Sequence, residues 1–355
     1  MQIPPRAAQV ALALVLCVSA GALFSALHVP LAWMLGSMIA MAAARMSGAK
    51  VEQLAWGRAA GMVVVGVSLG LYFTSPVIHE VSSFWPWFLL LGALAIGAGA
   101  MSAYVLAKLS GVDAATAYFG SMPGGASEMT IMGEPYGAAV HSVAFAHSVR
   151  VLLVVTLFPI AITAGGFHAS DDYRPIVTPF DPFGLALLLT LGAAAGLLAR
   201  MLRAPTAFMM GPLFATIAVT AIGYRVSSMP TPLVNAAQVL LGCAMGARFE
   251  RSFLREAPKF ALALIPSVLT MLVLATLVGL LISLGSGVYI GGGLLVAAPG
   301  GIAEMSLTAK ILRIGVAFVT AGHVMRYLMV VIFTVPVYRL YVRMAQVNRA
   351  ASPPA

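Results

Sequence analysis

Two short stretches, PGGASEM at residues 123–129 and PGGIAEM at residues 299–305, decide the fold class because they are copies of one motif placed 176 residues apart. Each copy is followed at the same offset by a His-x-x-Arg pair, at residues 147–150 and 323–326. Fainter echoes lie at offsets of 175 or 176: Pro30 and Gly36 correspond to Pro205 and Gly211, and Gly66 and Gly70 correspond to Gly242 and Gly246. One register kept over so many positions predicts an internal duplication.

The composition indicates that both copies are embedded in a membrane. Of 355 residues, 61% are hydrophobic and 9% charged, whereas a soluble domain has roughly 25% charged residues. The formal charge of +9 comes from Lys and Arg in short loops between apolar runs, as in multi-pass proteins of the bacterial inner membrane. Cys17 and Cys243 have no partner at ligand or disulfide spacing, so we expect inert thiols.

Each half contains five apolar segments, which predict an all-α polytopic membrane protein of about ten transmembrane helices in two five-helix repeats. The segments are 8–28, 30–47, 58–73, 84–109 and 138–165, then 183–203, 205–224, 233–248, 258–284 and 314–341. The predicted units are a first repeat at 1–165, a linker at 166–182 that contains Asp171 and Asp172, a second repeat at 183–342 and a tail at 343–355. The first segment is expected to be a retained helix and no signal peptide, because the run at 183–198 occupies the same place in the second half.

Between the fourth and fifth segments lie glycine-rich stretches, 113–136 and 289–312, that either re-enter or span the membrane. If both re-enter and the N-terminus is cytoplasmic, 14 of the 20 Lys and Arg residues are cytoplasmic and four are outside. If both stretches span the membrane, ten Lys and Arg residues are cytoplasmic and eight are outside. The positive-inside rule therefore favours re-entry, cytoplasmic termini and an odd number of crossings per half. The second repeat is then inverted, as in many secondary transporters.

The Pro-Gly-Gly steps predict a binding site, because the backbone that they expose at membrane depth must be buried in protein or line a cavity. A half-helix that starts after such a step points its free N–H groups at the cavity, which suits an anion or a carboxylate of the protein itself. The helix-break residues are Pro123, Gly124, Gly125, Pro299, Gly300 and Gly301.

Glu128 and Glu304 fall in the opening turn of the two half-helices. A charge near the bilayer centre costs about 2.5–3.5 kcal/mol on insertion scales, so a functional site with a partner is the default interpretation. We expect the two acids to carry protons or bind cations. The alternative is that each caps its own half-helix or pairs permanently with Arg150 or Arg326, which would otherwise hold an anionic substrate.

The remaining candidates are weaker. His147 and His323 share a helical face with the arginines. One hypothesis is that each histidine carries a proton, and the other is that it only hydrogen-bonds a buried group. Hydroxyl ligands are expected from Ser127, Thr130 and Ser306, although Ala303 replaces Ser127 in the second copy. Glu134 and His141 are not candidates, since Lys310 and Ala317 stand at their places in the second half.

The repeated Pro-Gly-Gly-x-x-Glu-Met with a following His-x-x-Arg resembles the membrane AbrB family over residues 30–341. Members of that family are labelled ammonia monooxygenases or regulators of gene expression. The enzyme label is disfavoured because the six histidines are scattered, whereas an oxygenase metal needs clustered ligands. We therefore expect no enzyme, no metal and no cofactor. Direct nucleic-acid binding is also disfavoured, because no basic soluble domain is present.

The function predicted from the sequence is ion- or proton-coupled secondary transport of a small polar solute across the inner membrane. The alternative is a membrane sensor that affects gene expression indirectly and transports nothing. The expected partners are the lipid bilayer and the solute or ion. Homo-oligomerisation stays open, because small residues such as those at 92–102 serve lipid-facing and partner-facing surfaces alike.

Overall fold

The computed structural model describes residues 6–167, 178–224, 226–249 and 257–351, with side chains described as far as Arg343. The chain is helical, and no strand occurs among these residues. Six helices are long and apolar enough to cross a membrane. They are α1 (Arg6–Ala26), α5 (Trp85–Ser110), α8 (Val140–Ala164), α9 (Pro182–Met201), α13 (Pro258–Ser286) and α16 (Val316–Ala351). The protein is therefore an α-helical membrane protein, as its composition predicts.

Four of the ten expected segments form helices that are shorter than a span. They are α2 (Ala32–Met46), α3 (Gly57–Gly70), α10 (Ala207–Ala221) and α11 (Thr231–Gly246). At 1.5 Å per residue such helices extend roughly 21–24 Å, less than a hydrocarbon core of roughly 30 Å. Helix α3 is followed by α4 (Ser75–Ser83), an element that the sequence analysis missed, and the pair counts as a seventh span if its 91° bend is included. The count of ten spans stays a prediction.

The short helices pack in crossed pairs, α2 against α11 and α3 against α10, so each pair joins the two halves of the chain. The repeated glycines lie at these crossings. Gly66 and Gly70 of α3 face the backbone of α10, and Gly242 and Gly246 of α11 face the backbone of α2. Small residues let helices approach this closely in lipid. The glycines that recur in the two halves of the sequence therefore lie at equivalent helix crossings.

Two further equivalent glycines lie at close contacts with the first helix of each half: Gly36 of α2 packs against α1, and Gly211 of α10 packs against α9. A Cβ on Gly36 would lie 2.5 Å from the carbonyl oxygen of Ala20, and one on Gly211 would lie 2.5 Å from that of Ala195. Backbone atoms cannot move aside cheaply, so Gly36→Ala is expected to destabilise the protein by about 1–3 kcal/mol. Thermal unfolding in detergent measures the effect. Gly97→Ala in α5, where a Cβ meets open space, is the control and should not lower the melting temperature.

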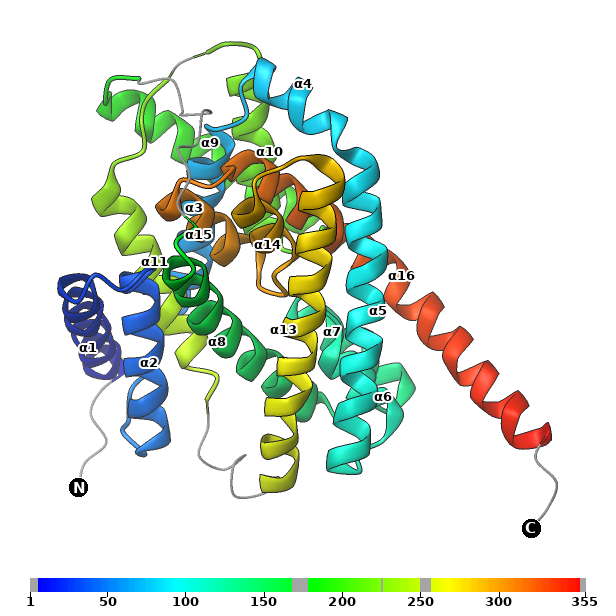
Figure 1. Ribbon diagram of the computed structural model, residues 1–355. Coiled ribbons are helices and arrows are strands. Elements are labelled where there is room, and N and C mark those ends of the chain that lie inside the picture. The colour runs from blue at the N-terminus through cyan, green and yellow to red at the C-terminus, as the bar shows by residue number, and fades with distance from the viewer. Residues whose placement is uncertain (1–5, 168–177, 225, 250–256, 352–355) are drawn as a thin grey trace.

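Both glycine-rich stretches form helices that are interrupted at the Pro-Gly-Gly step (Figure 1). The first comprises α6 (Ala114–Ser121), a break at residues 122–125, α7 (Ala126–Gly133) and the 3₁₀ turn η1 (Glu134–Tyr136). The second comprises α14 (Ile290–Ala297), a break at 298–301 and α15 (Ile302–Leu312). A proline without an N–H followed by two glycines stops the helix in both copies at the same place.

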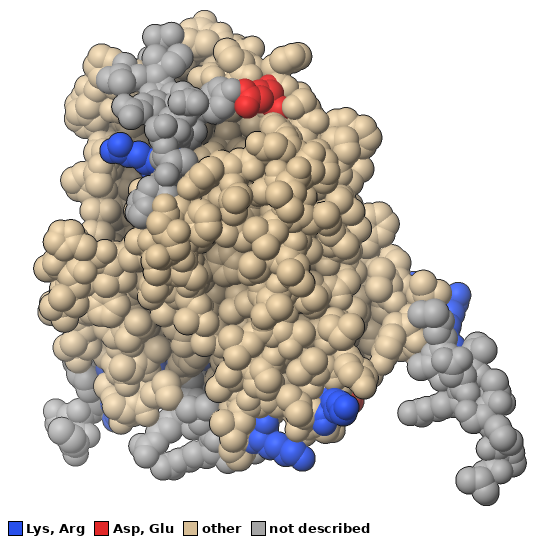
Figure 2. Space-filling view, viewed as in Figure 1, with Lys and Arg blue, Asp and Glu red and all other residues tan. Residues whose placement is uncertain are grey.

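The ends of the described chain lie on one side of the molecule, the lower side in Figure 1, where α1 begins and α16 ends. Helix α16 extends to Ala351, so most of the predicted tail continues this helix. On the face shown in Figure 2 most visible basic atoms lie along the lower margin, and the middle band is almost free of charge. The predicted linker acids Asp171 and Asp172 lie outside the described residues.

Candidate functional site

Arg150 of α8 and Arg326 of α16 hold the two helix breaks by hydrogen bonds to their backbone carbonyl oxygens. The guanidinium of Arg150 donates to the carbonyl oxygens of Met122 at 2.5 Å and Gly124 at 2.9 Å. Arg326 donates in the same way to Ala298 and, at 2.7 Å, to Gly300. A planar guanidinium suits this task because it offers several N–H groups in a fixed fork.

These bonds correct one expectation from the sequence. A permanent ion pair between each arginine and its glutamate was one alternative for Glu128 and Glu304. Within the described part of the chain, neither arginine forms a salt bridge with Glu128 or Glu304. The partners of the arginines are the carbonyls that the broken helices leave free, which a search for oppositely charged side chains overlooks.

His147 and His323 also contact the broken helices through backbone. The Nε2 atom of His147 lies 2.9 Å from the carbonyl oxygen of Phe119 in α6, and that of His323 lies 2.9 Å from the carbonyl oxygen of Leu295 in α14. A carbonyl only accepts hydrogen bonds, so Nε2 is the donor in both. This geometry supports the structural alternative for the histidines, in which each ties a half-helix to α8 or α16.

Each glutamate folds back over the glycine at the start of its own half-helix. A Cβ built on Gly125 would collide with the Glu128 carboxylate, and one on Gly301 would collide with that of Glu304. These glycines are the N-cap residues of α7 and α15, so each glutamate stands at the third helical position, which is the place of the acid in a capping box. Glycine is therefore required three residues before each glutamate, because a larger residue there would clash with the glutamate carboxylate. Glu304 is buried, with 4% of its surface exposed, whereas Glu128 is partly exposed.

A cavity of about 90 Å³, called here the central cavity, lies between the two breaks. Both broken segments and α3, α8, α10, α11 and α16 contribute to its wall. Its polar lining consists of Arg58, His147, Ser148, Arg150, Thr206, Arg248, Glu304, Arg326 and Tyr327. The structure thus brings Glu304, His147 and both break-holding arginines of the predicted site together, with residues of both halves in one wall.

Five of these residues were missed by the sequence analysis, namely Arg58, Ser148, Thr206, Arg248 and Tyr327. Arg58 opens α3 and Arg248 follows α11, so both were counted as cytoplasmic loop charges. Their equivalents in the other repeat are Val234 and Tyr72, so the repeat search carried no signal for them. Only the crossing of the short helices places them beside the breaks.

The central cavity carries an excess of positive charge. Four guanidinium groups line it against one carboxylate, that of Glu304, which lies within electrostatic range of Arg58, Arg150 and Arg248. The charged residues singled out from the sequence, two acids and two arginines, do not account for this excess, because Arg58 and Arg248 add to it. The Nε atoms of both break-holding arginines are buried and have no hydrogen-bond partner in the described structure.

The hydroxyl candidates lie elsewhere. Ser127 and Thr130 line a cavity of about 560 Å³ beside the central one, which we call the His141 cavity because that residue lines it too. The two cavities share Ala126, Ser148 and Arg248. Ser306 is fully buried within α15, and its hydroxyl has no partner among the described residues.

Fold and site together define a class of protein: an α-helical membrane protein built from a duplicated module whose broken helices meet around a basic cavity. The chain belongs to the AbrB family, since the family model described as Transition state regulatory protein AbrB matches residues 33–342. It is 26% identical over 348 residues to the "Uncharacterized protein YhjN" of Bacillus subtilis (strain 168), which covers 90% of each chain. It is 27% identical over 239 residues to a protein of Escherichia coli (strain K12) named "Putative regulator AbrB", covering 66% of this chain and 68% of the relative.

Proposed function

We propose that this protein is a proton- or ion-coupled secondary transporter of a small anionic solute across the bacterial inner membrane. The observation that carries the proposal is the central cavity, which is enclosed by both helix breaks and has four arginines against one acid in its lining. Substrate sites at broken helices near the bilayer midplane are typical of secondary transporters. The volume of about 90 Å³ favours a small solute.

The charges around Glu304 indicate how a proton and an anion are coupled. An ionised Glu304 neutralises part of the field of Arg58, Arg150 and Arg248. Protonation removes that negative charge and leaves the guanidinium groups available to a bound anion, so proton and anion bind together. Electrostatic interactions of this kind are strong in a site that excludes water.

The proposal includes the architecture predicted from the sequence, two inverted repeats with ten crossings. Two observations support this architecture. The helix pair α2–α11 is equivalent to the pair α3–α10, and an arginine hydrogen-bonds the helix break in the same way in both halves. Inversion brings two such half-sites face to face and lets one bundle move against the other.

The regulatory name of the Escherichia coli relative is compatible with transport, because a transporter that changes the level of an inducer alters gene expression without touching DNA. We propose no enzymatic reaction for the site. The competing proposal is a sensor without a transport cycle, and the wild-type assay below separates the two.

Transport is tested with the purified protein in proteoliposomes under an imposed pH gradient. Formate, acetate, lactate, chloride and neutral glycerol are supplied in turn, and the internal pH and solute are followed against protein-free liposomes. At least one anion is expected to accumulate and to dissipate the gradient faster than in the controls. A folded protein that moves none of these solutes and leaves the gradient intact contradicts the proposal.

A further inference from the structure

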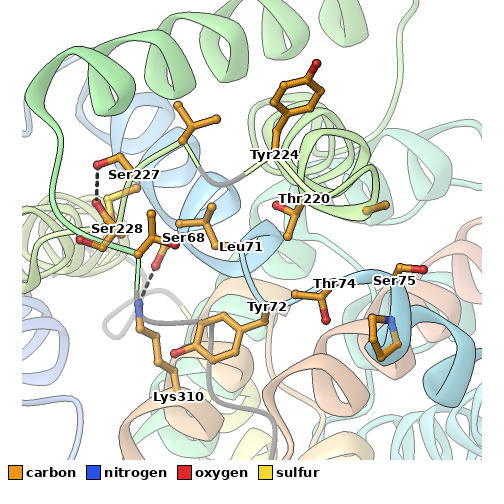
Figure 3. A pocket seen from close by; sticks show the side chains of 16 residues that line it. Ser68, Leu71, Tyr72, Thr74, Ser75, Thr220, Tyr224, Ser227, Ser228 and Lys310 are labelled. Carbon is orange, nitrogen blue, oxygen red and sulfur yellow. Dashed lines mark hydrogen bonds between the residues drawn. The ribbon is translucent and has the colours of Figure 1, made fainter.

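A third cavity, of about 610 Å³, lies at the C-terminal end of α3 (Figure 3). We call it the Lys310 cavity, after the residue of α15 that enters it. Its other walls come from the turn between α3 and α4, from the end of α10, from Gly223 and Tyr224, and from residues 226–229 (Figure 3). Its hydroxyl-bearing lining residues are Ser68, Tyr72, Thr74, Ser75, Thr178, Thr220, Tyr224, Ser227 and Ser228.

Lys310 is the only cation among the described residues of this lining, and it has contacts on two sides. Its Nζ donates to Oγ of the buried Ser68 at 2.6 Å and lies 5.7 Å from the ring centroid of Tyr72. No Asp or Glu is among the described residues of the lining. A lysine among hydroxyl groups, with no acid among the described residues around it, suits a negatively charged group. Glu134 occupies the equivalent place in the first repeat, so this feature belongs to the second repeat alone.

The Lys310 cavity and the central cavity lie along the same two helices. Helix α3 contributes Met62 to the central cavity and Ser68 to the Lys310 cavity, and α15 contributes Glu304 and Lys310 respectively. Six residues of helix separate the two positions in each case, roughly 9 Å at 1.5 Å per residue.

Packed side chains close this path in the structure. Val65 of α3 and Leu307 of α15 lie in the intervening turns, are fully buried and belong to the same hydrophobic cluster. The central cavity shares no lining residue with the Lys310 cavity but shares three with the His141 cavity. The central cavity thus adjoins the His141 cavity, and buried apolar side chains lie between it and the Lys310 cavity, an arrangement that matches one state of an alternating-access cycle.

We propose that the Lys310 cavity is a second binding site, which takes a small monocarboxylate before the solute reaches the central cavity. A single ammonium ion and neutral hydroxyl donors balance one negative charge, whereas a phosphate dianion favours bidentate arginine. The larger volume admits the carboxylate with part of its water. Binding at Lys310 stands on this geometry alone, and the passage to the central cavity rests on the proposed transport function.

Binding is measured with a fluorophore on Ser75→Cys, since Ser75 is an exposed residue of the lining and Cys17 and Cys243 are buried. The labelled full-length protein in nanodiscs is titrated with acetate, lactate and inorganic phosphate. Acetate or lactate is expected to give a saturable change, and Lys310→Gln to weaken it at least about tenfold, as expected for the loss of a charged hydrogen-bond donor. Ser68→Ala should weaken it less, because the ammonium remains.

The matched control is Arg313→Gln, which removes a positive charge from an exposed residue at the end of the same helix and should leave the titration unchanged. If neither carboxylate saturates, if phosphate binds more tightly than both, or if Lys310→Gln and Arg313→Gln behave alike, the site is refuted. Lys310→Met serves as a second variant if Lys310→Gln is not monodisperse.

The same variants separate this site from the transport proposal. In proteoliposomes Lys310→Gln is expected to raise the half-saturating anion concentration and leave the maximal rate nearly unchanged. If ligand binding depends on Lys310 but the protein transports nothing, the binding site is confirmed and the transport proposal is refuted. Transport with unchanged half-saturation in Lys310→Gln refutes the role on the path.

Discussion

Glu304→Gln is expected to reduce proton-coupled solute movement in proteoliposomes to less than about a tenth of the wild-type rate, because a tenfold loss needs only about 1.4 kcal/mol. Glutamine has nearly the same shape as glutamate and retains an oxygen that can face the N-terminus of α15. It lacks the charge that opposes Arg58, Arg150 and Arg248 and cannot take up a proton. The fold should therefore persist, with a melting temperature close to that of the wild type.

The control for this variant is Glu134→Gln, which removes an acid from the exposed turn η1 and should transport normally. Glu128→Gln tests the equivalent acid of the first repeat. It is expected to have a smaller effect, because Glu128 is partly exposed and does not line the central cavity. Full transport by Glu304→Gln at every imposed pH gradient would show that this acid is only a helix cap.

Arg326→Met is expected to have the largest effect on stability. It removes the donors that serve the carbonyl oxygens of Ala298 and Gly300, in a side chain of which 2% is exposed. Hydrogen bonds to charged groups contribute roughly 1.5–3 kcal/mol each, so the loss is about 3 kcal/mol or more. The expected outcome is a lower melting temperature and loss of the monodisperse peak in size-exclusion chromatography.

Two companions make this result interpretable. Arg313→Met removes an exposed arginine and should change the melting temperature little. Arg326→Lys retains the charge but lacks the fork that reaches two carbonyls, so its stability should fall between those of Arg326→Met and the wild type. If Arg326→Met is as stable as Arg313→Met, Arg326 does not hold the break.

The polar residues of the site show how far sequence reasoning extends. Glu304, Arg150 and Arg326 are recognisable because each is an ionisable group inside a long apolar run or a broken helix, where an unpartnered charge is costly. Arg58 and Arg248 carry no such signal, since each stands at a helix end among other loop cations. Because both line the central cavity, its four arginines outnumber its one glutamate.

The sequence by itself determined the membrane class through its composition, and the repeat and the two positions where helices stop through the duplicated Pro-Gly-Gly-x-x-Glu stretches. These features depend on local chemistry, namely hydropathy, a missing N–H and the absence of a Cβ. The tertiary structure alone decided what the breaks face. Helix α3 of the first half crosses α10, and α11 of the second half crosses α2, so the lining of the cavity comes from residues far apart in the chain. Their meeting depends on packing between helices, which no local pattern encodes.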